Sequence, residues 1–169
     1  RGLGDVYKRQ GETGKMLAKD KWRLVYGAGD VGLMGALANG CQNNGGNTFG
    51  VIPKHLLQEE VGKTDLSTFI ITESMHERKK LMFTNCNAIV TLPGGVGSLD
   101  EFFEILTWTQ LGISTKPLYL LNIDGYWDLV IQLIDQMVNQ GFAEGSLLNK
   151  FTIINSVAEL ETNLLNIFS

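Results

Sequence analysis

The stretch PGGVGSLDE at residues 93–101 combines a glycine-rich break, a hydroxyl and two carboxylates. Gly94, Gly95 and Gly97 allow the backbone to turn sharply after an apolar run. The free N–H groups of the helix that follows, its dipole and the Ser98 hydroxyl favour a bound anion, and a monophosphate is the natural occupant. Because the spacing is not G-x-x-x-x-G-K-[ST], the loop does not match a triphosphate-binding P-loop.

Glu101, in the same predicted helix, has two interpretations. With Ser98 as the N-cap, Glu101 would stand at the third helical position and complete a capping box. Alternatively, a carboxylate beside a bound phosphate would face the next part of the ligand, a sugar or its leaving group, because it cannot attract the phosphate itself. The residues alone leave both interpretations open.

A second glycine motif, GAGDVG, matches G-x-G-x-x-G through Gly27, Gly29 and Gly32 and stands between a strand-like and a helix-like segment. A nicotinamide dinucleotide site also needs an acid at the end of the next strand, and that strand, TFGVIP, ends in Pro53. The sequence therefore argues against NAD. A tight packing turn and a loop that approaches another nucleotide both remain as interpretations.

Apolar, strand-like runs alternate with helical segments along the chain. The expected strands are 22–27, 48–53, 66–72, 87–92, 116–122 and 151–155, and the expected helices are a segment ending at Lys19, then 32–46, 74–86, 98–112, 126–141 and 156–168. Continuous apolar strands are typical of parallel sheets buried on both faces. The pattern predicts the α/β class, with a doubly wound parallel sheet in a single domain over residues 11–169. Residues 1–10 show no clear period, and we expect them to be non-native or poorly ordered.

Composition limits the possible partners. The formal net charge is -4 with no basic stripe, so we expect no nucleic-acid partner. No apolar run approaches the ~20 residues of a membrane helix, and the only two cysteines are not in C-x-x-C spacing, which together predict a cytoplasmic protein without a membrane partner. H-E-x-x-K at 76–80 lacks the second histidine of a zinc protease, and no lysine lies in the glycine loops to form a pyridoxal Schiff base. These residues therefore favour neither a zinc protease nor a pyridoxal enzyme.

The motif PGGVGSLDE resembles the PGG-x-GT-x-x-E signature of the LOG ("Lonely guy") family, and SMHERKK resembles the M-x-x-R-K element of the same family. The stretches LVYGAGDVGLMG, GVIP, TWTQLG and KPLYLLN also resemble the family, in the family's order. These proteins are cytokinin riboside 5'-monophosphate phosphoribohydrolases, long described as lysine decarboxylases. The resemblance implies a Rossmann-like fold, a homodimer, no cofactor, and hydrolysis of the N-glycosidic bond of AMP or an N6-substituted AMP.

The resemblance also implies roles for individual residues. It implies a catalytic pair, Arg78 and Glu101. It implies a phosphate loop formed by Gly94, Gly95, Val96, Gly97 and Ser98. It also implies further substrate-binding residues, namely Met75, Lys79, Gly29 and Gly32. A carboxylate near the anomeric carbon can stabilise an oxocarbenium-like sugar or polarise the attacking water. Arg78 keeps its proton, so it would donate hydrogen bonds to the base or phosphate, or hold Glu101 ionised. Without the family, Arg78 would read as one solvated charge in the run HERKK.

The chain departs from the family at three places. Ala28 stands where the family usually has the middle glycine of GGG, and Ser98 where it has threonine. No segment matches the strand and small-residue loop with which family members begin, so we expect the N-terminal strand of the sheet to be missing. The alternative function is a non-catalytic carrier of a nucleotide or a molybdenum cofactor on the same fold. Such a carrier has no use for both Arg78 and Glu101.

Overall fold

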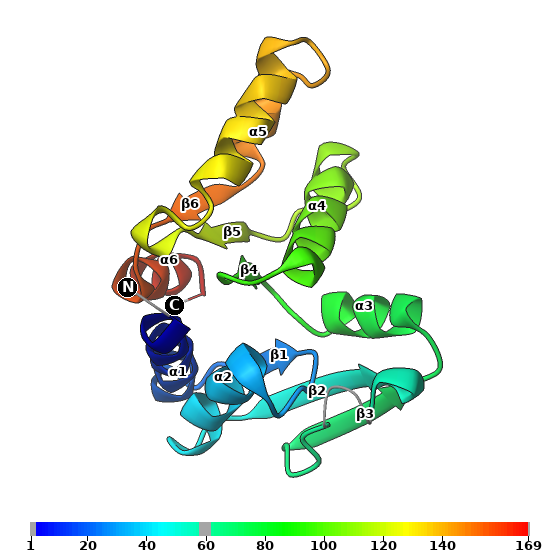
Figure 1. Ribbon diagram of the computed structural model, residues 1–169, viewed down its shortest axis with the longest axis vertical. Coiled ribbons are helices and arrows are strands. Elements are labelled where there is room, and N and C mark those ends of the chain that lie inside the picture. The colour runs from blue at the N-terminus through cyan, green and yellow to red at the C-terminus, as the bar shows by residue number, and fades with distance from the viewer. Residues whose placement is uncertain (1–2, 58–61, 169) are drawn as a thin grey trace. The chain divides into compact units, whose positions relative to one another are not determined.

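A computed structural model describes residues 3–57 and 62–168 as two compact units, Arg1–Cys86 and Asn87–Ser169 (Figure 1). Each unit has α/β architecture, which confirms the predicted class. The first unit contains α1 (Leu3–Lys19), β1 (Leu24–Tyr26), α2 (Gly32–Gln42), β2 (Thr48–Pro53), the 3-10 turn η1 (Lys54–Leu56), β3 (Thr68–Thr72) and α3 (Met75–Thr84). The second contains β4 (Ile89–Thr91), α4 (Val96–Gln110), β5 (Leu118–Leu121), η2 (Ile123–Gly125), α5 (Asp128–Asn139), η3 (Gly145–Asn149), β6 (Thr152–Ile154) and α6 (Val157–Phe168).

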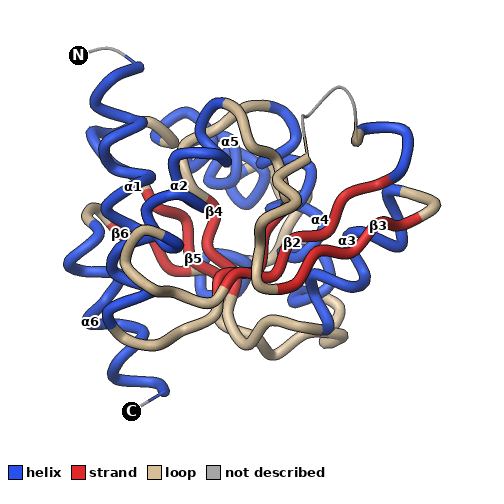
Figure 2. Tube along the Cα trace, turned by 90° about the horizontal axis from the view of Figure 1, so that it is seen from below, coloured by secondary structure: helices blue, strands red, loops and turns tan. Residues whose placement is uncertain are grey.

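Each unit has a three-stranded parallel sheet at its centre, in the order β1-β2-β3 in the first and β4-β5-β6 in the second. Figure 2 shows β2 and β3 running side by side. The middle strands, β2 and β5, are buried along their whole length, as their continuous apolar sequences predicted. Every strand lies within its expected range.

Helix α1 begins at Leu3, inside the segment that its sequence led us to set aside. This helix packs along α2 at close backbone contact. A Cβ atom added at Gly14 would lie 2.2 Å from the Leu37 carbonyl oxygen, and one added at Gly40 would lie 2.3 Å from the Gly11 carbonyl oxygen. Glycine on both helices thus lets α1 pack closely against α2. Residues 3–10 are part of α1, and whether residues 1–10 are native stays a prediction.

The strand that comes first in each unit is an edge strand, because among the described strands β1 pairs with β2 alone and β4 with β5 alone. A central first strand missing from this sequence remains a prediction. Both edge strands matter for the site, since each leads from its carboxyl end directly into one of the two glycine motifs. Residues 58–61, between η1 and β3, lie outside the described residues. In the described ranges, no helix has both the length and the apolar character needed to cross a bilayer.

Candidate functional site

The helix after the PGGVGS loop begins earlier than its sequence suggested. Gly95 is the N-cap of α4, with φ -103° and ψ -153°, and its carbonyl accepts a hydrogen bond from the Leu99 N–H at 3.3 Å. Ser98 therefore lies inside the first turn, and the expectation that Ser98 caps the helix is wrong. Because the extended backbone that a cap requires falls on Gly95, Glu101 stands at the sixth helical position and cannot complete a capping box.

The glycines of this loop differ in what they do for the fold. A Cβ atom at Gly94 would lie 2.2 Å from the Ser98 hydroxyl oxygen, so packing requires glycine there. At Gly95 and Gly97, by contrast, an added Cβ would meet nothing within 4 Å, and neither residue has a positive φ. Both are exposed, and the N-cap has no side chain to bind the N–H groups of the first turn. Neither packing nor backbone strain explains these two glycines, and a role in binding a ligand stays a prediction.

Glu101 lies on α4 one turn beyond the loop. It follows Gly97 by four residues and Ser98 by three, and residues at these spacings share a helix face. Its side chain is partly buried. Glu101 therefore does not cap α4, and its predicted action on the sugar of a bound nucleotide stays a prediction.

Arg78 is buried in α3, with 5% of the residue exposed, and is not the solvated charge that the run HERKK suggests. Its Nη2 donates a 2.8 Å hydrogen bond to the Gly27 carbonyl, and its Nη1 lies 3.8 Å from the Met75 sulfur. A Cβ at Gly27 would stand 1.8 Å from Nη2, so the first glycine of GAGDVG leaves room for the guanidinium. Ser74 caps this helix, because its hydroxyl accepts a hydrogen bond from the Glu77 N–H at 3.2 Å.

The GAGDVG loop is held by a second segment of the first unit. Ala28 is fully buried with φ 60°, and its carbonyl accepts a 2.9 Å bond from the Lys63 N–H. Lys63 is buried, with 7% of the residue exposed, and its ammonium group pairs with the carboxylates of Asp30 at 3.1 Å and Asp65 at 3.2 Å. Burial lowers the pKa of Lys63, but hydrogen bonds and charges from both carboxylates outweigh it, so the pKa lies above its usual 10.5. Lys63 therefore stays charged.

Two further glycines of this loop were predicted to touch a substrate. A Cβ at Gly29 would lie 2.4 Å from the terminal methyl carbon of Met34, a flexible side-chain end that can move aside, so packing does not by itself require glycine there. Gly32 is exposed with φ 63°, a left-handed backbone that favours glycine. Burial first, and then the negative charges of Asp30 and Asp65, raise the pKa of Tyr26 at the end of β1. The left-handed backbone supports the turn interpretation at Gly32, and contact of Gly29 and Gly32 with a ligand stays a prediction.

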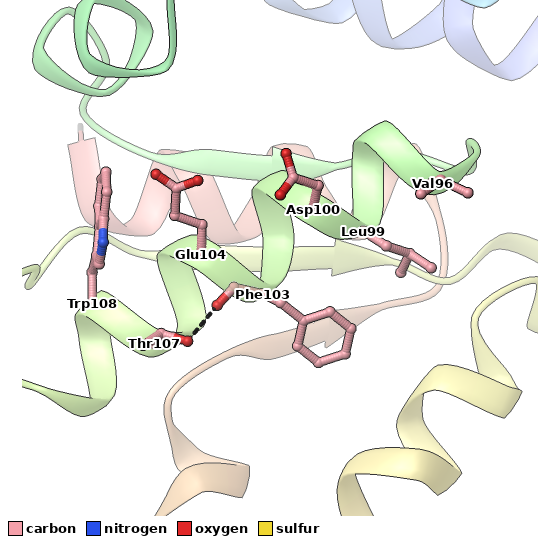
Figure 3. Close-up of a pocket in the computed structure, with 7 residues that line it drawn as sticks. All are labelled: Val96, Leu99, Asp100, Phe103, Glu104, Thr107 and Trp108. Atoms are coloured by element: carbon pink, nitrogen blue, oxygen red, sulfur yellow. Dashed lines mark hydrogen bonds between the residues drawn. The ribbon is translucent and has the colours of Figure 1, made fainter. Parts of the chain in front are cut away.

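An open hollow of about 410 Å³ runs along one face of α4 (Figure 3). Apolar side chains and two carboxylates line it, namely Val96, Leu99, Asp100, Phe103, Glu104, Thr107 and Trp108. The opposite side of the helix carries the buried residues Phe102, Ile105 and Leu106. Of the residues that line the hollow, Val96, Asp100 and Thr107 are exposed and the others are partly buried.

The structure shows contacts among some of the predicted site residues, whereas the roles of the others stay predictions. Arg78 contacts Met75 and Gly27 in the first unit, and Ser98 lies against Gly94 in the second. Arg78 and Glu101 belong to different units, so their pairing stays a prediction, as does substrate binding by Lys79. Sequence reasoning missed Lys63, which lies in a connection without a recognisable pattern, and Tyr126, whose hydroxyl bonds to the Gly94 carbonyl at 2.6 Å. Across residues 3–57 and 62–168, no three His, Cys, Asp or Glu side chains gather into a metal-binding group.

Comparison with known sequences agrees with these motifs. The family model described as "Possible lysine decarboxylase" matches residues 34–164. "Probable cytokinin riboside 5'-monophosphate phosphoribohydrolase LOG4" from Oryza sativa subsp. japonica is 40% identical over 153 residues, which are 90% of this chain and 66% of the relative. "Cytokinin riboside 5'-monophosphate phosphoribohydrolase LOG2" from Arabidopsis thaliana is 42% identical over 123 residues, 73% of this chain and 58% of the relative. The chain spans less than two thirds of the length of these relatives.

Comparison with solved structures supports the fold. A molybdenum cofactor binding protein from Rippkaea orientalis matches with a TM-score of 0.72 and 21% identity, covering 97% of this chain and 88% of the other. The molybdenum cofactor carrier protein of Chlamydomonas reinhardtii matches with a TM-score of 0.67 and 20% identity at the same coverage. At this identity the likeness shows a shared Rossmann-like fold.

Proposed function

We propose that this chain, which belongs to the family described as "Possible lysine decarboxylase", is a nucleoside 5'-monophosphate phosphoribohydrolase. It hydrolyses the N-glycosidic bond of AMP or of cytokinin riboside 5'-monophosphate, and the products are the free base and ribose 5-phosphate. The names of relatives about 40% identical over most of this chain support the activity.

The exposed glycines Gly95 and Gly97 are the observation that carries the proposal. They leave room at the N-terminus of α4 where the N–H groups of the first turn point outward, and neither the backbone nor packing needs them. A 5'-phosphate fits this position because the N–H groups and the helix dipole both favour a dianion. Gly94, Val96 and Ser98 complete the loop in this proposal.

In the proposed reaction, the oxygen of one water molecule bonds to the anomeric carbon as the bond to the base nitrogen breaks. The electron pair of that bond leaves with the base, which takes up a proton, and the water loses one. Glu101, one turn beyond the phosphate, stabilises the cationic sugar and polarises the water. Arg78 remains a cation and donates hydrogen bonds to the base or phosphate. Met75, Lys79, Gly29 and Gly32 are the further substrate-binding residues in this proposal.

The decarboxylase description of the family receives no support from Lys63. A Schiff-base lysine must be available as a neutral amine, which requires a lowered pKa. Lys63, the buried lysine near the GAGDVG loop, is instead paired with two carboxylates, and its pKa is raised. We therefore keep the hydrolase proposal and give the chain no cofactor.

We also propose that the protein is a cytoplasmic homodimer in which the outward face of α4 is buried. Phe103 and Trp108 line the open hollow of that helix, and Leu111 and Ile113 at its end are 67% and 66% exposed. An apolar face of this kind suits an isologous contact. Light scattering at micromolar concentration should give twice the mass of 18.6 kDa, and a monomer would refute the assembly.

A product assay tests the activity. Purified protein is incubated with AMP, N6-prenylated AMP, GMP, CMP and adenosine, and the released base is separated by chromatography. We expect base from the adenine monophosphates and much less from adenosine, because adenosine lacks the phosphate. Binding of AMP without any release of base would instead support the carrier alternative, and equal turnover of adenosine and AMP would contradict the phosphate site.

A further inference from the structure

We infer that Tyr126 is a positioning residue for the phosphate loop, an inference that rests on the proposed function. Its hydroxyl donates a 2.6 Å hydrogen bond to the Gly94 carbonyl, 32 residues earlier in the chain. Tyr126 follows η2 after β5, and Gly94 follows β4, the parallel neighbour of β5. The bond therefore ties together two loops at the carboxyl ends of adjacent strands, where ligands bind in sheets of this kind.

The hydrogen bond fixes the direction of a donor that the phosphate needs. In a trans peptide, the C=O and the N–H point in opposite directions within one plane. Since Tyr126 holds the Gly94 carbonyl, the N–H of Gly95 in the same peptide points away from the tyrosine. As the N-cap, Gly95 gives its carbonyl to α4 while its own N–H lies outside the helical ladder. Glycine on both sides would otherwise leave this peptide free to rotate.

The backbone that carries Tyr126 is firmly held. The turn reverses through left-handed residues Asp124 and Gly125, with φ 54° and 73°. Asn122 anchors it, because its main-chain N–H donates to the Ile154 carbonyl at 2.7 Å and its side-chain oxygen accepts from the Trp127 N–H at 2.7 Å. The Tyr126 ring also packs edge-on against the ring of buried Trp127, with 4.7 Å between the ring centroids.

Burial does not force the Tyr126 hydroxyl into this bond. Tyr126 is 52% exposed, so water could satisfy its hydroxyl in any other rotamer. A short bond to a loop carbonyl from an exposed side chain on a fixed turn fits a role in loop geometry better than a role in the core. Loss of the Tyr126 hydroxyl should therefore weaken the binding of ligands that carry a phosphate and leave the binding of ligands without a phosphate unchanged.

The test compares Tyr126→Phe with the wild-type protein by calorimetric titration with AMP and with adenosine. The variant keeps the ring and loses only the hydroxyl. We expect the preference for AMP over adenosine to fall by roughly 3- to 10-fold, the effect of one lost hydrogen bond. The KM for AMP should rise by the same factor, with kcat within about twofold, as a loss of uniform binding requires. Tyr119→Phe, which removes a hydroxyl from the middle of β5, is the matched control and should leave the preference unchanged.

The possible outcomes separate this inference from the proposed function. A wild-type protein that does not prefer AMP over adenosine overturns the phosphate site and, with it, the role of Tyr126. A wild-type protein that does prefer AMP, paired with an unchanged preference in Tyr126→Phe, overturns only the role of Tyr126. Equal weakening of AMP and adenosine binding, or the same effect in Tyr119→Phe, would show a general effect on the fold and would also overturn it.

Discussion

Replacing Gly27 by alanine tests whether the end of β1 holds the Arg78 guanidinium in place. The new Cβ would stand 1.8 Å from Nη2, whereas ordinary contacts begin at 3.4 Å, so the guanidinium must move by about 1.6 Å. That movement breaks the 2.8 Å bond to the Gly27 carbonyl. Loss of a hydrogen bond to a charged group costs roughly 1.5–3 kcal/mol of stability. A misplacement of about 1 Å at a reacting centre can cost about 100-fold in rate, so kcat/KM for AMP should fall by about that factor.

A double-mutant cycle shows whether Gly27→Ala acts by displacing the Arg78 guanidinium. In an Arg78→Ala background there is no guanidinium to displace, so Gly27→Ala should lower adenine release by at most about threefold more. Gly145→Ala is the control, because a Cβ there meets nothing within 4 Å, and its activity should match the wild type. The reasoning is refuted if Gly27→Ala keeps near wild-type activity, or if its effect is equally large with and without Arg78.

Two other perturbations test the fold around the site. Gly40→Ala places a Cβ 2.3 Å from the Gly11 carbonyl, so urea unfolding should show a loss of about 1–3 kcal/mol if α1 packs on α2, and an unchanged midpoint would contradict that packing. The pKa of Lys63 is raised above its usual 10.5 in the folded protein, so its ion pairs stabilise the fold fully below about pH 10 and lose their effect as the pH rises through the folded pKa. The stability difference between wild type and Lys63→Met should therefore be constant from pH 7 to 9 and shrink at higher pH, and a difference that grows with pH would be inconsistent with these pairs.

Much of the fold could be predicted because its signals are local. The strand TFGVIP has the predicted bounds, since a buried parallel strand reads as a continuous apolar run ended by proline. The cap of α3 is also a local signal, because both of its hydrogen bonds lie within one turn. The Ser74 hydroxyl accepts from the Glu77 N–H, and the Glu77 carboxylate accepts from the Glu73 N–H. The start of α1 was missed because its glycines look like breaks until a second helix packs against them.

The site was harder to predict where contacts join distant segments. Arg78 bonds to Gly27, 51 residues away, and nothing in the run HERKK indicates that one of its charges is buried. Ser98 was a reasonable cap by residue type, but α4 begins three residues earlier than that, with Gly95 as its N-cap. The bond between Tyr126 and Gly94 depends on the pairing of β4 with β5, which sequence patterns place only approximately.

The central claim is that the loop at 94–98 holds a phosphate while Glu101 acts on the sugar. Glu101→Gln tests it most directly, because the substitution keeps shape and removes charge, and Glu101 does not cap α4. Adenine release from AMP and the Kd for AMP are measured together, with Glu144→Gln, an exposed acid of the same unit, as the control. We predict that release falls by about 100-fold or more, the range of general acid–base groups, while the Kd stays within about threefold. Near wild-type adenine release by Glu101→Gln would contradict the account.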